Sequence, residues 1–331
     1  MPRQLLTTPV DKLPDDVLHA ALPTPFPVGP VNCYLLAAEP VTLVDPGMVF
    51  PDSLAALEAL LASAGLRVAD VEVVLVTHGH PDHYGAAGWV AERSAARVVC
   101  GAAERVKVLG RKIPGYMPLL AGLGMPADLI ERFPTLREST VDHIVYPTPE
   151  ALTSCGDGDV LAAGGRDWTV VETPGHAAGH LSLWDPGARV LLSGDHLLPH
   201  ITPNPALEAD DAPGGRRRSL IEYLDSLPRF AALDPAVVLP GHGPAFTDVD
   251  QLIANLRRHH EERSVKVAAL VAEMGSPTPY DVAMRLFPTL TGFSVMLGVS
   301  EAVGHLDLLV AEGRLRQVDE HPFRFAANGV A

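Results

Sequence analysis

The sequence of 331 residues predicts an α/β fold whose short buried strands end in turns that carry histidine or aspartate. Two observations lead to this prediction. Apolar, β-branched stretches such as Val71–Val76 have the length and composition of buried strands, and Gly- or Pro-containing turns follow them. After about residue 250 the pattern changes to longer amphipathic stretches, which are typical of helices. We therefore expect a layered strand-rich domain followed by a helical tail.

The turn after Val71–Val76 has the highest density of chemically active side chains. His78, His80, Asp82 and His83 lie within six residues. Imidazole nitrogens and carboxylate oxygens are ligands that zinc and related metals accept. Folding alone does not call for this concentration, so the turn is a candidate metal site.

Three later strands repeat the same arrangement, with a Gly or Pro turn and then a metal-type side chain. Glycine lets the backbone bend sharply at such turns. A single histidine in this position is more often structural, but four such turns in order indicate a common site. The side chains are His176 and His180 after Trp168–Glu172, Asp195 and His196 after Leu191–Ser193, and His242 after Val237–Leu239.

The pattern H-x-H-x-D-H, followed by His, Asp and His, resembles the metallo-β-lactamase-fold hydrolase superfamily from about Pro25 to Pro244. Within it, the pattern is most similar to glyoxalase II and its relatives. The resemblance implies a four-layer αβ/βα sandwich with two metal ions, and Asp45 as either a hydrogen-bond partner of the ligands or a turn residue. It implies this ligand set: His78, His80 and His176 for the first metal, Asp82, His83 and His242 for the second, and Asp195 bridging them.

The activity that the resemblance implies is metal-dependent hydrolysis of a small ester, thioester or lactone by a metal-bridging hydroxide. Two divalent ions are expected, most simply Zn²⁺, although iron and manganese accept the same ligands. Asp82 would hold the nucleophile as well as bind metal. His180, or else His196, would assist proton transfer, and a structural role for each stays open.

Other members of the superfamily provide the alternatives. The commonest β-lactamases have Cys where this chain has Asp195, so antibiotic hydrolysis is disfavoured. Redox-active diiron relatives have Glu in place of His80, which favours hydrolysis here. Three alternatives stay open: a single-strand endoribonuclease, a mononuclear-iron enzyme similar to persulfide oxygenases, and a non-catalytic metal-binding regulatory protein.

Composition limits the partners and the compartment. A formal net charge of −15 disfavours a nucleic-acid partner and favours a small-molecule substrate. We expect no membrane span, because no apolar run reaches about 18 residues. The start, Met1–Asp16, has no apolar signal segment, and the three cysteines are scattered and odd in number. A cytoplasmic enzyme is therefore expected.

Two domains are predicted: a hydrolase domain over residues 1–250 and a winged-helix-like domain over residues 251–331. The tail should contain three helices and a two-stranded wing: Gln251–Met274, Pro279–Leu286, Ser294–Glu312, Arg314–Val318 and Phe323–Phe325. Residues 255–331 hold eight Lys or Arg and nine Asp or Glu, and the third helix has no Lys or Arg. A nucleic-acid reader would show a basic face, so we expect the tail to serve in packing, including a possible homodimer.

Two further segments lie outside the metal motifs. Residues 102–149 have helical character broken by prolines, which predicts a helical insertion that acts as a lid, a pocket wall or a subunit contact. The segment Glu208–Arg218 is acidic and then basic, and is expected to be an exposed loop.

Overall fold

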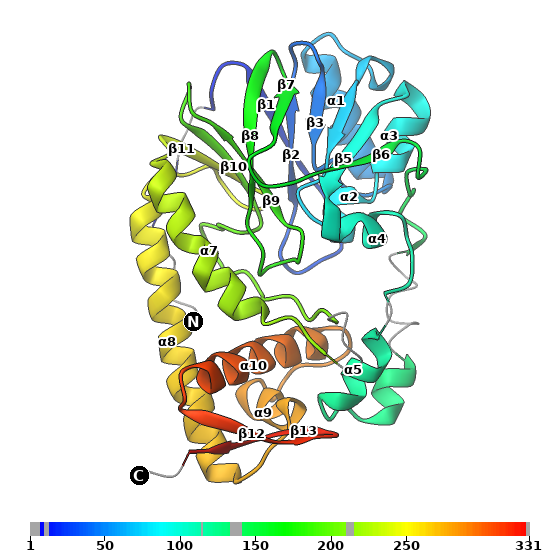
Figure 1. Ribbon diagram of the computed structural model, residues 1–331. Coiled ribbons are helices and arrows are strands. Elements are labelled where there is room, and N and C mark those ends of the chain that lie inside the picture. The colour runs from blue at the N-terminus through cyan, green and yellow to red at the C-terminus, as the bar shows by residue number, and fades with distance from the viewer. Residues whose placement is uncertain (1–6, 10–12, 114, 133–140, 210–214, 329–331) are drawn as a thin grey trace. The chain divides into compact units, whose positions relative to one another are not determined.

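The computed structural model describes residues 7–9, 13–113, 115–132, 141–209 and 215–328 (Figure 1). Their contacts group into two compact units. The first contains the described residues within Met1–Lys112, Thr140–Pro203 and Ser226–Ile253. The second contains those within Ile113–Ser139, Asn204–Asp225 and Ala254–Ala331.

The first unit is built on two β-sheets. The six-stranded sheet has the order β1 (Val17–Leu22), β2 (Val31–Leu36), β3 (Thr42–Val44), β4 (Val73–Leu75), β5 (Arg97–Gly101) and β6 (Leu152–Cys155). The five-stranded sheet has the order β11 (Val237–Pro240), β10 (Val190–Gly194), β9 (Leu181–Asp185), β8 (Arg166–Glu172) and β7 (Val160–Ala163). The four strands predicted to precede the metal-type turns are β4, β8, β10 and β11, so these strand predictions are confirmed.

Apolar side chains of the two sheets form a shared core, which includes Tyr34, Leu75, Trp168 and Leu183. The other face of the six-stranded sheet packs against α1 (Pro51–Ser63) and α3 (Ala87–Ser94). The C-terminal half of α7 (Ser219–Leu233) lies on the five-stranded sheet's side, where Arg229 donates a hydrogen bond to the carbonyl oxygen of Glu172. The predicted four-layer αβ/βα sandwich is confirmed.

The directions of the strands place the predicted ligands at the same edge of each sheet. β3 and β4 are parallel. β10 and β11 are parallel, and β8 runs in the same direction as β10 because both are antiparallel to β9. The carboxyl ends of these strands, where the metal-type turns begin, therefore lie at one edge of each sheet. Other helical segments of this unit are η1 (Val68–Asp70), α2 (Pro81–Tyr84), η2 (Ala102–Glu104) and α4 (Arg105–Val108).

The second unit is mainly helical. It contains α5 (Tyr116–Gly122), α8 (Val249–Met274) from Ala254 onward, α9 (Pro279–Leu286), α10 (Ser294–Ala311), and the antiparallel strands β12 (Leu315–Glu320) and β13 (Phe323–Ala327). The helices and strands of the predicted tail are thus present. Leu119 and Leu123 of the predicted insertion share a core with Val271, Leu306 and Phe325 of the tail.

The division of the chain is more complex than a single boundary at residue 250. Contacts place the described residues within 113–139 and 204–225 with the C-terminal segment, while residues 102–112 belong to the first unit. The winged-helix identity of the tail and the lid role of the insertion stay predictions.

The segment Glu208–Arg218 corrects one expectation. Residues 210–214 lie outside the described residues, but Arg216 is buried rather than exposed. Its guanidinium pairs with the buried carboxylate of Asp307 on α10, with an Nη2–Oδ1 distance of 2.5 Å. A carboxylate buried in a helical core needs such a partner, because an unpaired charge there is costly.

The helix α10 is the one described helix long and apolar enough to cross a membrane. Most of its residues are buried inside the second unit, where they pack with α5, α8 and α9. This burial is what the core helix of a globular domain shows.

Candidate metal centre

The turn after β4 begins the site. Thr77–His80 leave the strand, and Pro81 occupies the first position of α2, where a fixed φ suits the helix start. His78 and His83 are fully buried, and Asp82 is nearly so. The short helix therefore holds Asp82 and His83 beside the histidines that precede it.

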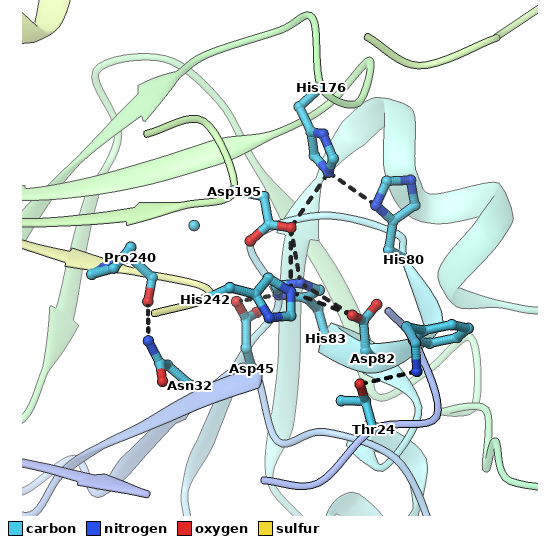
Figure 2. Close-up of polar contacts among 12 residues, drawn as sticks. Thr24, Asn32, Asp45, His80, Asp82, His83, His176, Asp195, Pro240 and His242 are labelled. Atoms are coloured by element: carbon cyan, nitrogen blue, oxygen red, sulfur yellow. Dashed lines mark hydrogen bonds and ion pairs between the residues drawn. The ribbon is translucent and has the colours of Figure 1, made fainter. Parts of the chain in front are cut away.

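The predicted ligands meet in three overlapping groups. Figure 2 shows His80, Asp82, His83, His176, Asp195 and His242 of these groups. One comprises His78, His80 and His176. The Nδ1 atom of His80 lies 2.8 Å from Nε2 of His78 and 3.0 Å from Nε2 of His176. The other groups are His78, His83 and Asp195, and Asp82, His83 and His242.

Asp195 lies between the two predicted ligand sets. Its Oδ2 atom is 3.6 Å from Nε2 of His176 and 4.0 Å from Nε2 of His78. The same oxygen is 3.4 Å from Nε2 of His83 and 3.5 Å from Nε2 of His242. Ligand atoms of a tetrahedral zinc ion with bonds of about 2.0–2.1 Å are roughly 3.3 Å apart. One carboxylate oxygen thus lies at ligand-to-ligand distance from both sets.

Hydrogen bonds fix which nitrogen of each imidazole faces the centre. Asp45 accepts from Nδ1 of His83 at 2.8 Å, and also from the backbone and hydroxyl of Thr77. The carbonyl oxygen of Pro30 accepts from Nδ1 of His242 at 2.7 Å. Both rings are therefore left with Nε2 unprotonated when neutral, as a metal ligand must be. This geometry supports the interpretation of Asp45 as a hydrogen-bond partner of a predicted ligand.

The electrostatics of the site separate two kinds of histidine. Burial, together with neighbouring imidazoles, lowers the pKa of His78 and His80 well below the usual range. Burial also opposes the charge of His83 and His242, but Asp195 and neighbouring carboxylates outweigh it and raise the pKa of both. The same histidines lower the pKa of Asp195 against the effect of burial. The carboxylate is thus ionised, which suits cation binding.

Three buried atoms at the centre have no hydrogen-bond partner among the described residues: Nε2 of His83, Oδ1 of Asp195 and Nε2 of His242. Leaving such atoms unsatisfied is costly. All three belong to predicted ligands and lie at the point where the sets meet. A donor set of imidazole nitrogens and carboxylate oxygens fits divalent transition metals.

Glycines allow the close approach of the two strand ends. The backbone at Gly194 has a φ of +49°, which favours glycine. A Cβ atom at Gly241 would lie 2.2 Å from Oδ1 of Asp195. The Gly turns seen in the sequence therefore serve the packing around Asp195.

Sequence reasoning missed Glu104, whose side chain is completely buried. Its carboxylate accepts hydrogen bonds from the backbone N–H of Gly79 at 2.9 Å and of Gly179 at 2.7 Å, and pairs with Lys107 at 2.9 Å. It thereby ties the loop of His78 and His80 to the loop of His176. The only sequence signal was an acidic residue just after a buried strand.

Asn32 was also missed. Its side-chain amide donates to the carbonyl oxygens of Pro240 and Gly243 at 2.8 and 2.7 Å, so it holds the loop that carries His242 (Figure 2). Tyr34 donates to the same Pro240 oxygen at 2.8 Å.

The candidates for proton transfer are buried. The backbone N–H of Asp195 donates to Nε2 of His180 at 3.0 Å, and Nδ1 of His180 lies 2.7 Å from the hydroxyl of Thr173. Both ring nitrogens of His180 are therefore engaged within the protein. His196 contacts the hydroxyl of Ser226 at 2.8 Å.

Comparisons with known proteins identify the family of the chain. The profile of the Metallo-beta-lactamase superfamily matches residues 26–242. A relative described as probable metallo-hydrolase YqjP of Bacillus subtilis is 32% identical over 90% of this chain and 93% of its own length.

Two crystal structures share the architecture over nearly the whole chain. The metallo-beta-lactamase family protein TTHA1429 from Thermus thermophilus is 30% identical, with a TM-score of 0.82 over 96% of this chain and 100% of that one. A beta-lactamase domain protein from Burkholderia ambifaria is 29% identical, with a TM-score of 0.80 over 99% and 96% of the two chains. The chain belongs to the metallo-β-lactamase superfamily, as a metallo-hydrolase-type member with candidate metal-binding His/Asp clusters.

Proposed function

We propose that the protein is a binuclear metallohydrolase of the glyoxalase II-like branch, acting on a small ester, thioester or lactone. One observation carries the proposal. The Oδ2 atom of Asp195 lies within 4.0 Å of ring nitrogens from both ligand sets. A carboxylate in this position suits two cations, because one oxygen serves both ligand sets.

The proposed ligand set is that of the sequence prediction, with two divalent ions, most simply Zn²⁺. When bound, such ions would lower the pKa of a water molecule between them and polarise the bond to be cleaved. The abundance of imidazole nitrogens favours zinc or iron over magnesium or calcium.

The chain's own residues have distinct parts in this proposal. Asp82 faces Nε2 of His242 at 3.4 Å, and its carboxylate would both bind metal and orient the attacking water. Asp45 and the Pro30 carbonyl hold ligand rings in the required tautomer. For His180 the geometry favours a positioning role, because its Nε2 accepts from the backbone of Asp195. Its predicted part in proton transfer stays a prediction.

The substrate class follows from charge. With 40 acidic and 25 basic residues, the chain repels polyanions at long range. A small molecule suits this field better than RNA. Self-association through the tail and a cytoplasmic location are parts of the same proposal; the cysteines within the described residues are unpaired, which suits a reducing compartment.

The test is metal analysis beside a substrate panel. Purified protein should contain about two ions per chain and should hydrolyse a thioester, ester or lactone. One iron per chain with no hydrolysis would contradict the proposal and favour the oxygenase-like relatives. Cleavage of a short single-stranded RNA, with no ester or thioester turnover, would favour the endoribonuclease alternative.

A further inference from the structure

A second cluster of metal-type side chains lies in the helical unit, among residues that the predicted hydrolase site does not use. His260 of α8 faces Glu301 and His305 of α10, and all three are buried, with exposed fractions of 1%, 7% and 0%. Glu301 and His305 are four residues apart, so they project from the same face of α10. Together the three offer two imidazoles and one carboxylate.

The distances in this cluster match those in the first site. Nε2 of His305 lies 3.4 Å from Nδ1 of His260 and 3.4 Å from Oε1 of Glu301. One ligand atom from each of the three lies within 4.8 Å of the other two. In the first site the corresponding separations around Asp195 run from 3.4 to 4.0 Å. Both are close to the roughly 3.3 Å edge of a tetrahedral zinc site.

The surroundings prepare His305 to be a ligand. The hydroxyl of Ser264, one turn along α8 from His260, lies 3.0 Å from Nδ1 of His305. That contact occupies one nitrogen and directs the other toward Glu301 and His260. Metal-binding histidines commonly have such a partner on the second nitrogen.

One nitrogen of the His260 ring lacks a hydrogen-bond partner in the described part of the chain. Nε2 of His260 is buried and has no hydrogen-bond partner among the described residues. A structural polar network in a core normally pairs every such atom. The nitrogen of His260 that faces His305 is Nδ1, at 3.4 Å, so the unsatisfied Nε2 leaves the hydrogen bonding of this buried ring incomplete.

Burial lowers the pKa of His260 to about 3. For Glu301 burial acts in the opposite direction, but His305, His260 and Arg263 outweigh it and lower the pKa to about 2. The guanidinium of Arg263 lies 3.6 Å from Oε1 of Glu301. The other groups that act on the cluster are His259 and the ring of Tyr223, which packs on His260.

We infer that His260, Glu301 and His305 form a separate binding site for one divalent transition-metal ion such as Zn²⁺. Two imidazole nitrogens and one carboxylate oxygen provide three ligands, and a water molecule completes the tetrahedron. Because the ligands come from α8 and α10, the ion joins these two helices within the helical unit. This site is independent of the hydrolase activity and of the number of ions in the first site.

A difference measurement tests the site without reference to activity. The variants are His305→Gln and Glu301→Gln, and the control is His321→Gln, an exposed histidine of the same unit. Metal is removed from each protein with a chelator. The protein is then dialysed against a zinc solution, and its metal content per chain is measured. We expect both variants to hold about one ion per chain fewer than the wild type, and the control to match the wild type. Equal metal content in all four proteins would overturn the inference.

A second measurement uses the wild-type protein, so it does not depend on the folding of a variant. Crystals grown with zinc are expected to show an anomalous scattering peak between His260 and His305. Peaks at the first site with none between these two residues would overturn the inference as well.

Discussion

The two His–carboxylate clusters of this protein are built in opposite ways. In the first, the ligands lie in the turns that follow buried strands or, for Asp82 and His83, in the short helix α2 after such a turn, so separate segments converge at the sheet edges. In the second, the ligands sit within two helices and face each other across a core. Side chains in turns can point at a common centre from several directions. Within a helix, the spacing of the residues along the chain sets the direction of each side chain.

The difference extends to the groups that orient the ligands. In the first cluster a charged carboxylate, Asp45, holds His83. In the second a neutral hydroxyl, Ser264, holds His305. A carboxylate partner raises the basicity of the imidazole more than a hydroxyl does. The comparison therefore predicts a tighter first site and a weaker second one.

The largest effect should come from Asp195→Ala. Removing the oxygen shared by both ligand sets should lower metal content and reduce turnover by more than about 100-fold, since even indirect partners of metal ligands cost about 10- to 100-fold. Metal analysis and hydrolysis assays on the same preparation check this. Asp52→Asn, on the exposed side of α1, is the control and should behave as wild type. Unchanged turnover in the alanine variant would rule out the two-metal mechanism.

Asp45→Asn should have the next largest effect. The amide keeps the shape of the carboxylate but loses its charge, so the metal affinity of the set with His83 should fall about 10- to 100-fold. Competition with a chromogenic chelator measures the affinity. If Asp45 is only a turn residue, held by its φ of +54°, the variant will bind metal as tightly as the wild type.

Much of the first cluster could be predicted from the sequence because its ligands come with local signals. His78 to His83 form one dense run, and the three later turns repeat a strand followed by Gly or Pro. Short apolar strands and glycine turns are local features, so their order along the chain could be predicted without the structure. The αβ/βα layering followed from the resemblance rather than from these patterns.

The features that could not be predicted depend on contacts between residues that are distant in sequence. Glu104 acts by accepting from Gly79 and Gly179, which are 25 and 75 residues away. Arg216 is in a charged run that looks exposed, but it is buried by pairing with Asp307, 91 residues later. His260 and His305 are 45 residues apart and resemble ordinary core positions of amphipathic helices. No local pattern marks such partners.

Glu104→Gln should have a moderate effect, on stability more than on chemistry. The amide keeps one acceptor but loses the charge-assisted bond and the pairing with Lys107, so unfolding free energy should fall by about 1–3 kcal/mol. Urea unfolding of the metal-free protein measures it. Glu92→Gln, on the exposed surface of α3, serves as the control. Equal stability of the two variants would show that Glu104 does not hold the loops together.

The smallest effect is expected from Ser264→Ala. This variant removes the hydroxyl that orients His305 in the second cluster. Loss of one buried hydrogen bond to His305 should lower stability by about 0.5–1.5 kcal/mol. Zinc affinity at the helical site should fall by less than the loss that Asp45→Asn causes at the first site, because a neutral partner contributes less than a charged one. Zinc titration followed by thermal unfolding measures both quantities.

Ser94→Ala provides the matched control, because it removes a helix serine of the first unit that donates a hydrogen bond to the carbonyl of Val90. A larger loss of zinc affinity from Ser264→Ala than from Asp45→Asn would contradict the order that the two orienting groups predict.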